Sequence, residues 1–93
     1  MVNINLHAVF SVETGVKKFR LDIPEGTPAG KAILQIVALY PALRKYWITE
    51  DNGLSEHVFV VLNGKDIYTY PEGLQTLLTA EDTLDFFSPL AGG

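Results

Sequence analysis

Residues 84–93 read LDFFSPLAGG, and this stretch decides how the rest of the chain is organised. Residues 84–88 alternate as in a strand with one buried face, so Phe86 and Phe87 fall on opposite sides. Pro89 has no backbone N–H group to donate to a sheet and should end the pairing there. The sequence therefore predicts a closing strand that leads into a short tail.

Composition indicates one globular domain. The chain has 93 residues, of which 47% are hydrophobic and 19% are charged. These values are typical of a folded domain and not of a disordered chain. We therefore expect a single domain over residues 1–88 and a flexible Gly-Gly tail over residues 89–93. No apolar run approaches the roughly 20 residues of a membrane helix, and no signal-peptide pattern is present. A cytoplasmic location without a membrane partner is expected.

Several kinds of chemistry are disfavoured by residue type. The chain has no cysteine, which excludes disulfides, thiolate nucleophiles and cysteine metal sites. His7 and His57 are far apart and lack ligand spacing, so a structural or surface role is expected and no metal. Residues 1–49 carry a net charge of +3 and residues 50–93 carry −7. The acidic C-terminal half argues against nucleic acid as a partner.

The predicted strands have a recognisable order. Residues 2–12 alternate and predict a strand, and residues 18–23 predict a second strand that pairs with it as a hairpin. Residues 58–62 form an apolar run short enough for a buried strand. Asn63-Gly64 then signals a tight turn into a short return strand. With the closing strand, this is an α+β pattern.

One main helix is predicted between the first two strands and the later ones. Thr27-Pro28 suggests its start, with the threonine as N-cap, and Tyr40-Pro41 suggests its end. An apolar stripe along it should cover one face of the sheet. Leu34 and Leu39 lie off this stripe. We expect the helix to be sandwiched in the core, and the alternative is that part of it meets a partner.

Several motifs resemble those of the ubiquitin-like sulfur carriers, most closely the small subunit of molybdopterin synthase. They are YP at 40–41, EDNG at 50–53, HVFV at 57–60, NGKDI at 63–67, EGLQTL at 72–77 and FFSPLAGG at 86–93. The chain departs from the family pattern at Gln75, often aspartate, at Glu81-Asp82, often glycine-aspartate, and at Ser88-Pro89, often two prolines. The resemblance implies a β-grasp, ubiquitin-like fold: a mixed sheet of four to five strands covered by one main helix, with the first and last strands side by side at its centre.

The resemblance also implies a chemistry for the tail. It implies that the carboxylate of Gly93 is adenylated by an ATP-dependent activating enzyme and converted to a thiocarboxylate. In a sulfur carrier without cysteine, that carboxylate is the group available for loading. Pro89, Leu90, Ala91 and Gly92 would carry it into a partner's channel, since the five tail residues span at most about 16–18 Å when extended. The glycines lack Cβ atoms and suit a narrow channel.

Phe87 is the candidate contact for a partner protein. If Phe86 faces the core, Phe87 faces the opposite side just before the tail, where an aromatic ring can anchor an interface. The alternative is that loops of the domain itself cover Phe87.

The function implied by the resemblance is that of a carrier and not of an enzyme. The chain would donate sulfur in molybdopterin biosynthesis as the non-catalytic small subunit of molybdopterin synthase. Its partners would be the adenylating enzyme, which consumes ATP, and the large subunit, and the chain itself would bind no cofactor. The alternatives are a ubiquitin-like modifier conjugated through Gly93 to lysines, or a sulfur carrier for tRNA thiolation or thiamine synthesis. A free-standing enzyme finds no support, because no nucleophile–base pair or phosphate loop has suitable spacing.

Overall fold

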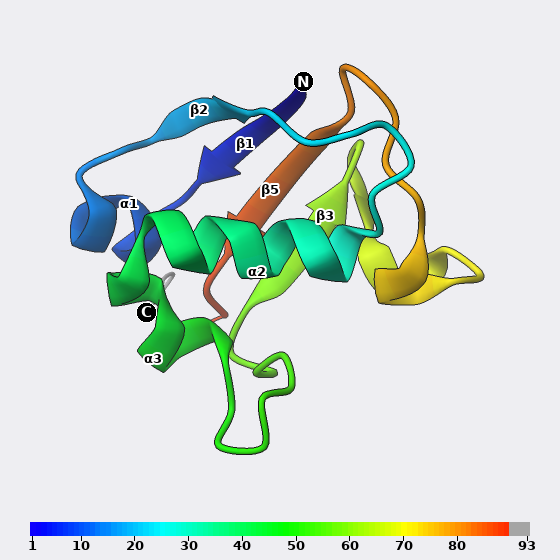
Figure 1. Ribbon diagram of the computed structural model, residues 1–93. Helices are drawn as coiled ribbons and strands as arrows, with labels where there is room; N and C mark the ends of the chain where they lie inside the picture. The colour runs from blue at the N-terminus through cyan, green and yellow to red at the C-terminus, as the bar shows by residue number, and fades with distance from the viewer. Residues whose placement is uncertain (90–93) are drawn as a thin grey trace.

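A computed structural model describes residues 1–89 as a five-stranded mixed sheet with helices on one side (Figure 1). The strands are β1 (Val2–Leu6), β2 (Lys18–Leu21), β3 (Phe59–Leu62), β4 (Lys65–Asp66) and β5 (Thr83–Phe87), in the order β2-β1-β5-β3-β4. The central pair, β1 and β5, is parallel, and the other three pairs are antiparallel. The predicted α+β class and the central placement of the first and last strands are confirmed.

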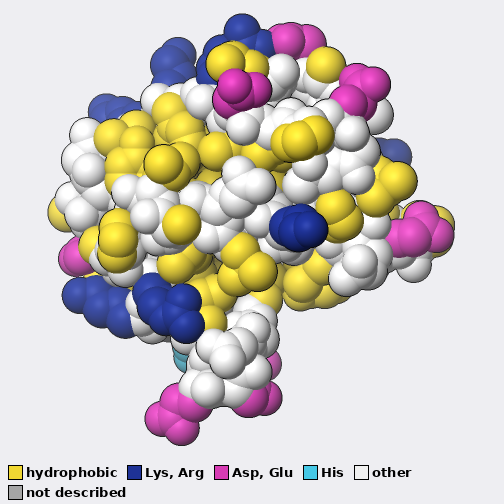
Figure 2. Space-filling view, in the orientation of Figure 1, with side chains coloured by type: hydrophobic (Ala, Val, Ile, Leu, Met, Phe, Trp, Pro, Cys, Tyr) yellow, Lys and Arg dark blue, Asp and Glu magenta, His cyan; other side chains and the backbone are white. Residues whose placement is uncertain are grey.

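The main helix, α2 (Ala29–Leu39), crosses one face of the sheet (Figure 1). It buries Ala29, Ala32, Ile33, Ile36 and Val37, as its apolar stripe predicts. The expectation that it is sandwiched in the core is wrong, because Leu34 is 52% exposed and Leu39 is 57% exposed. The sheet offers α2 a single surface to pack against, so the far side of the helix meets solvent. Figure 2 shows hydrophobic side chains exposed on this side of the molecule.

The first strand is shorter than its alternating pattern suggests. β1 ends at Leu6, Ala8 has a φ of 53°, and α1 (Val9–Thr14) follows. In a strand over residues 2–12, Phe10 and Val12 would both face the core with Leu6; Phe10 is fully buried, but Val12 is 78% exposed. The predicted strand is therefore wrong beyond Leu6. Phe10 could be buried from either a strand or a short helix. In the helix its ring packs edge-on against Trp47, with ring centroids 5.5 Å apart, and this contact favours the helix.

The start of α2 also differs from the prediction. Thr27 is not the N-cap: Pro28 occupies that position without a side-chain cap. The Thr27 hydroxyl instead donates to the carbonyl of Pro24 at 2.6 Å. The helix end is confirmed, since α2 stops at Leu39, directly before Tyr40-Pro41.

The remaining connections are short helical segments. They are η1 (Pro41–Leu43), α3 (Arg44–Trp47), η2 (Ile67–Thr69) and η3 (Gly73–Gln75). The predicted return strand after Asn63-Gly64 is the two-residue β4, which continues directly into η2. No helix of the described part of the chain has the length and hydropathy needed to cross a membrane.

The turn between β3 and β4 ties two distant parts of the sheet together. Asn63 and Gly64 have φ values of 50° and 85°, as a two-residue hairpin turn requires. The Asn63 side chain accepts a hydrogen bond from the Thr83 backbone at 2.9 Å and donates to Asp82 Oδ1 at 3.0 Å. It therefore joins the turn to the beginning of β5.

Asn63→Ala is expected to lower the free energy of unfolding by about 1–2 kcal/mol, because alanine is strained at positive φ and cannot replace the hydrogen bonds. Asn63→Gly is the matched control, since it keeps the backbone freedom and loses only the side chain. It should have about half the effect in urea denaturation. Equal losses for both variants would contradict the strain component.

Candidate functional site

The side of the sheet turned away from α2 carries the predicted partner contact. We call it the outer face. Residues that alternate with the buried ones lie there, and strand pairing brings them together: Phe59 lies opposite Phe87, and Val61 lies opposite Asp85. His7, directly after β1, lies beside them. These five residues, His7, Phe59, Val61, Asp85 and Phe87, are called the Phe87 surface below.

The two phenylalanines of β5 point to opposite sides, as alternation predicts. Phe86 is fully buried and stacks on Trp47, with ring centroids 4.4 Å apart. Phe87 is 37% exposed, and Phe59 opposite it is 48% exposed. Two partly exposed aromatic rings on adjacent strands form an apolar surface next to the point where the tail begins. Interfaces are enriched in such rings, and the predicted role of Phe87 as a partner contact stays a prediction.

His7 and Asp85 support the Phe87 ring. The imidazole of His7 stacks on Phe87 with centroids 4.1 Å apart and an interplanar angle of 8°. Its Nε2 lies 2.8 Å from Asp85 Oδ1, and its backbone N–H donates to the Phe86 carbonyl at 3.1 Å. From the sequence, His7 is expected to have a structural or surface role. Its contact with Phe87 depends on the parallel register of β1 and β5, in which Leu6 pairs with Phe86.

Charged side chains gather at the turn before β5, where Glu81 and Asp82 lie near Arg20 or the Asn63 turn. Arg20 Nη2 on β2 lies 2.6 Å from Glu81 Oε2. Partial burial raises the pKa of the Asp82 carboxyl, but hydrogen bonds from the Thr79 backbone and the Asn63 amide outweigh it, so the pKa lies below its ordinary value. Asp82 is therefore held in its charged form at the opposite end of β5 from Phe87.

The structure reaches Pro89 of the predicted tail. Pro89 follows β5 and is exposed. Leu90, Ala91, Gly92 and Gly93, which include the predicted attachment point for sulfur, lie outside the described residues. What the structure places is the base of the tail, two residues beyond Phe87.

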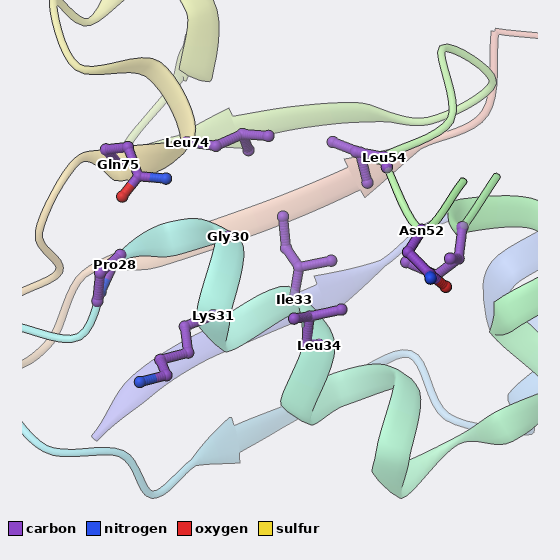
Figure 3. Close-up of a pocket in the computed structure, with 11 residues that line it drawn as sticks. Pro28, Gly30, Lys31, Ile33, Leu34, Asn52, Leu54, Leu74 and Gln75 are labelled. Carbon is purple, nitrogen blue, oxygen red and sulfur yellow. The ribbon is translucent and has the colours of Figure 1, made fainter. Parts of the chain in front are cut away.

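A groove of about 490 Å³ lies on the other side of the molecule, between α2, the loop after α3 and η3 (Figure 3). Ile33, Leu34, Leu54 and Leu74 supply much of its apolar lining. A Cβ atom at Gly30 would lie 3.4 Å from the Leu74 carbonyl oxygen, so glycine allows the η3 segment to approach the helix closely. No predicted site residue lines this groove. Within residues 1–89, no three histidine or acidic side chains form a metal-ligand group.

Fold and site together define a ubiquitin-like β-grasp protein, in which the central strand β5 carries an apolar surface and leads to the C-terminal segment. The particular group it resembles is the ubiquitin-like sulfur carriers and modifiers, as its sequence motifs indicated. Proteins of this group are small and generally non-catalytic. Neither a protein-family model nor a curated protein matches the sequence.

Solved structures support this likeness. SAMP1 of Haloferax volcanii is 27% identical, with a TM-score of 0.87 over 99% of this chain and 98% of that one. CysO of Amycolatopsis orientalis, in a complex with BexX, is 20% identical, with a TM-score of 0.79 over the whole of both chains. A putative molybdopterin converting factor subunit 1 of Pyrococcus furiosus is also 20% identical, with a TM-score of 0.76 over 96% of this chain and 97% of that one. The last two comparisons bear on the fold alone.

Proposed function

We propose that the protein is a sulfur carrier whose Gly93 carboxylate is adenylated, converted to a thiocarboxylate and used as a sulfur donor in molybdopterin biosynthesis. In this role it is the non-catalytic small subunit of molybdopterin synthase. The observation that carries the proposal is the course of β5. This strand runs through the sheet centre, places Phe87 on the outer face and ends immediately before the tail.

The chemistry divides between this chain and its partners. A carboxylate is a poor acyl donor, so an activating enzyme joins it to AMP from ATP and releases pyrophosphate. A sulfide-level nucleophile then attacks the terminal carbonyl carbon and AMP leaves, so that a C–S bond replaces the C–O bond to AMP and the product is the thiocarboxylate. The large subunit binds the Phe87 surface and receives the loaded tail. The expected cytoplasmic location and the absence of a bound cofactor belong to this proposal.

A second candidate is a ubiquitin-like modifier, in which the activated Gly93 forms an isopeptide bond with a lysine of a target protein. The greater likeness to SAMP1, a small archaeal modifier protein, than to the molybdopterin converting factor favours this alternative. Carriers for tRNA thiolation or thiamine synthesis use the same activated carboxylate. These functions share the activation step. In the modifier a lysine amine attacks the activated carbonyl carbon, whereas the carriers load sulfur there and pass it to different acceptors.

Phe87→Ala is expected to weaken association with the large subunit of the host's molybdopterin synthase by at least about tenfold, because it removes an aromatic anchor of the interface. The variant should remain folded, since Phe87 is outside the core. Isothermal titration calorimetry measures the affinity, and circular dichroism measures the fold.

Leu39→Ala is the matched control, because Leu39 is also an exposed apolar residue but lies on α2, on the other side of the sheet. It should leave the affinity unchanged. Unchanged affinity for Phe87→Ala, or equal losses for the two variants, would refute the Phe87 surface as the docking site. No binding by the wild-type chain would refute the molybdopterin assignment itself.

A further inference from the structure

Asparagine followed by glycine occurs in two exposed turns, at Asn52-Gly53 and at Asn63-Gly64. We propose that Asn52 is a site of spontaneous covalent modification, in which its side chain closes on the Gly53 nitrogen and loses ammonia, whereas the fold protects Asn63. This modification is independent of the proposed function, since Asn52 lines the groove beside α2 and is not part of the Phe87 surface (Figure 3).

The reaction needs only the chain itself and one water molecule. The Gly53 backbone nitrogen attacks the side-chain carbon Cγ of Asn52, a new C–N bond closes a five-membered imide ring, and the bond from Cγ to Nδ2 breaks. The proton of the Gly53 N–H group leaves with Nδ2 as ammonia. Water then opens one of the two ring C–N bonds and leaves either aspartate or isoaspartate at position 52. Glycine favours the attack because it has no Cβ atom beside its nitrogen.

The groups around Asn52 assist this attack. Arg44 Nη2 donates a hydrogen bond to Asn52 Oδ1 at 3.2 Å, so the guanidinium faces the oxygen on which negative charge develops. The Gly53 N–H donates to Thr49 Oγ1 at 3.0 Å, and the Thr49 hydroxyl in turn donates to Asp51 Oδ1. This second bond holds the pKa of Asp51 below its ordinary value, so Asp51 is a carboxylate. The Gly53 proton therefore has a path to an acceptor, from which it returns to the leaving nitrogen.

Asn63 is also exposed, but its side-chain amide is held at both ends. Its Oδ1 accepts from the Thr83 backbone N–H at 2.9 Å, and its Nδ2 donates to Asp82 Oδ1 at 3.0 Å. Asp82 is held in its charged form, so the second bond is charge-assisted and strong. Cγ reaches the Gly64 nitrogen only after both bonds break. The two turns share one dipeptide and differ in these contacts.

The product changes one wall of the groove. Asn52 lines the groove together with Gly53 and Leu54. An aspartate at position 52 adds a negative charge beside Arg44, which already bonds the side-chain oxygen there. An isoaspartate lengthens the backbone between Thr49 and Gly53, whose N–H and carbonyl groups close the turn at 2.8 Å.

The test incubates the full chain at pH 8, folded in buffer and unfolded in guanidinium chloride, and follows both asparagines over time. Trypsin cleaves after Lys45 and Lys65, so residues 46–65 form one peptide that contains both sites. Fragmentation in the mass spectrometer locates the mass difference between an amide NH₂ and a hydroxyl group. The unfolded chain gives the ratio of the two rates that is set by neighbouring residues alone. We expect the ratio of Asn52 to Asn63 modification to be at least about tenfold larger in the folded chain.

Two variants test the assisting groups. Arg44→Gln and Thr49→Val should each slow modification of Asn52 about threefold, as for a single exposed interaction, with Asn63 in the same peptide as the internal control. Circular dichroism checks that both variants are folded. The same ratio in the folded and unfolded chains, or a folded chain modified first at Asn63, would overturn the proposal. Rates at Asn52 that stay unchanged or rise in both variants would overturn the assistance by Arg44 and Thr49.

Discussion

Deletion of Gly93 is expected to abolish adenylation and sulfur loading, with exchange activity reduced by at least about a hundredfold. Without Gly93 the terminal carboxylate lies one residue short of the ATP phosphate to which the activating enzyme joins it. Small misplacements of a reacting group have effects of this size. The melting temperature should not change, because the core consists of residues upstream of the tail, from Val2 to Phe86.

Two comparisons sharpen this test. Addition of one alanine after Gly93 should abolish loading in the same way, since it also moves the carboxylate. Leu39→Ala, on the exposed side of α2, should retain full exchange activity. Exchange that survives the deletion would show that another group is activated. A large fall in melting temperature would show that the end of the chain is part of the folded domain.

Phe86→Ala is expected to lower the free energy of unfolding by about 3–5 kcal/mol, the range for removing a fully buried aromatic side chain. Phe86 is fully buried on the central strand and stacks on Trp47, which is itself fully buried. The cavity would open between the sheet and α3, where these two rings meet. Urea denaturation followed by circular dichroism measures the loss.

Phe87→Ala is the natural control for Phe86→Ala, since the two residues are adjacent and chemically identical. It should lower stability by about 1–2 kcal/mol, less than Phe86→Ala, because the Phe87 ring is 37% exposed and loses less buried area. Similar losses for the two variants would contradict the assignment of Phe86 to the core and Phe87 to the outer face.

Much of the fold could be predicted from residues with strong local preferences. Asn63-Gly64 adopts the positive φ values of a hairpin turn, and Tyr40-Pro41 ends α2, because both effects depend on neighbouring backbone atoms alone. The alternation of Phe86 and Phe87 likewise follows from strand geometry. The central pairing of β1 with β5 was implied by family resemblance and not by the residue pattern.

Features that depend on tertiary packing could not be predicted correctly from the sequence. The chain after Leu6 alternates like a strand but turns into α1, since Phe10 gains its contacts with Trp47 from a part of the sequence whose position is set by the fold. The contact of His7 with Phe87 depends on the register between the first and last strands. Local pattern carries no information on either.

The most direct test of the carrier proposal is the mass of the C-terminal peptide isolated from the native host during active cofactor synthesis. Lys65 is the last basic residue, so trypsin releases residues 66–93 as one peptide. A fraction of this peptide is expected to be heavier by the mass difference between sulfur and oxygen, with the extra mass located at Gly93. A peptide found only with its ordinary carboxylate, or mainly joined to lysines of other proteins, would contradict it.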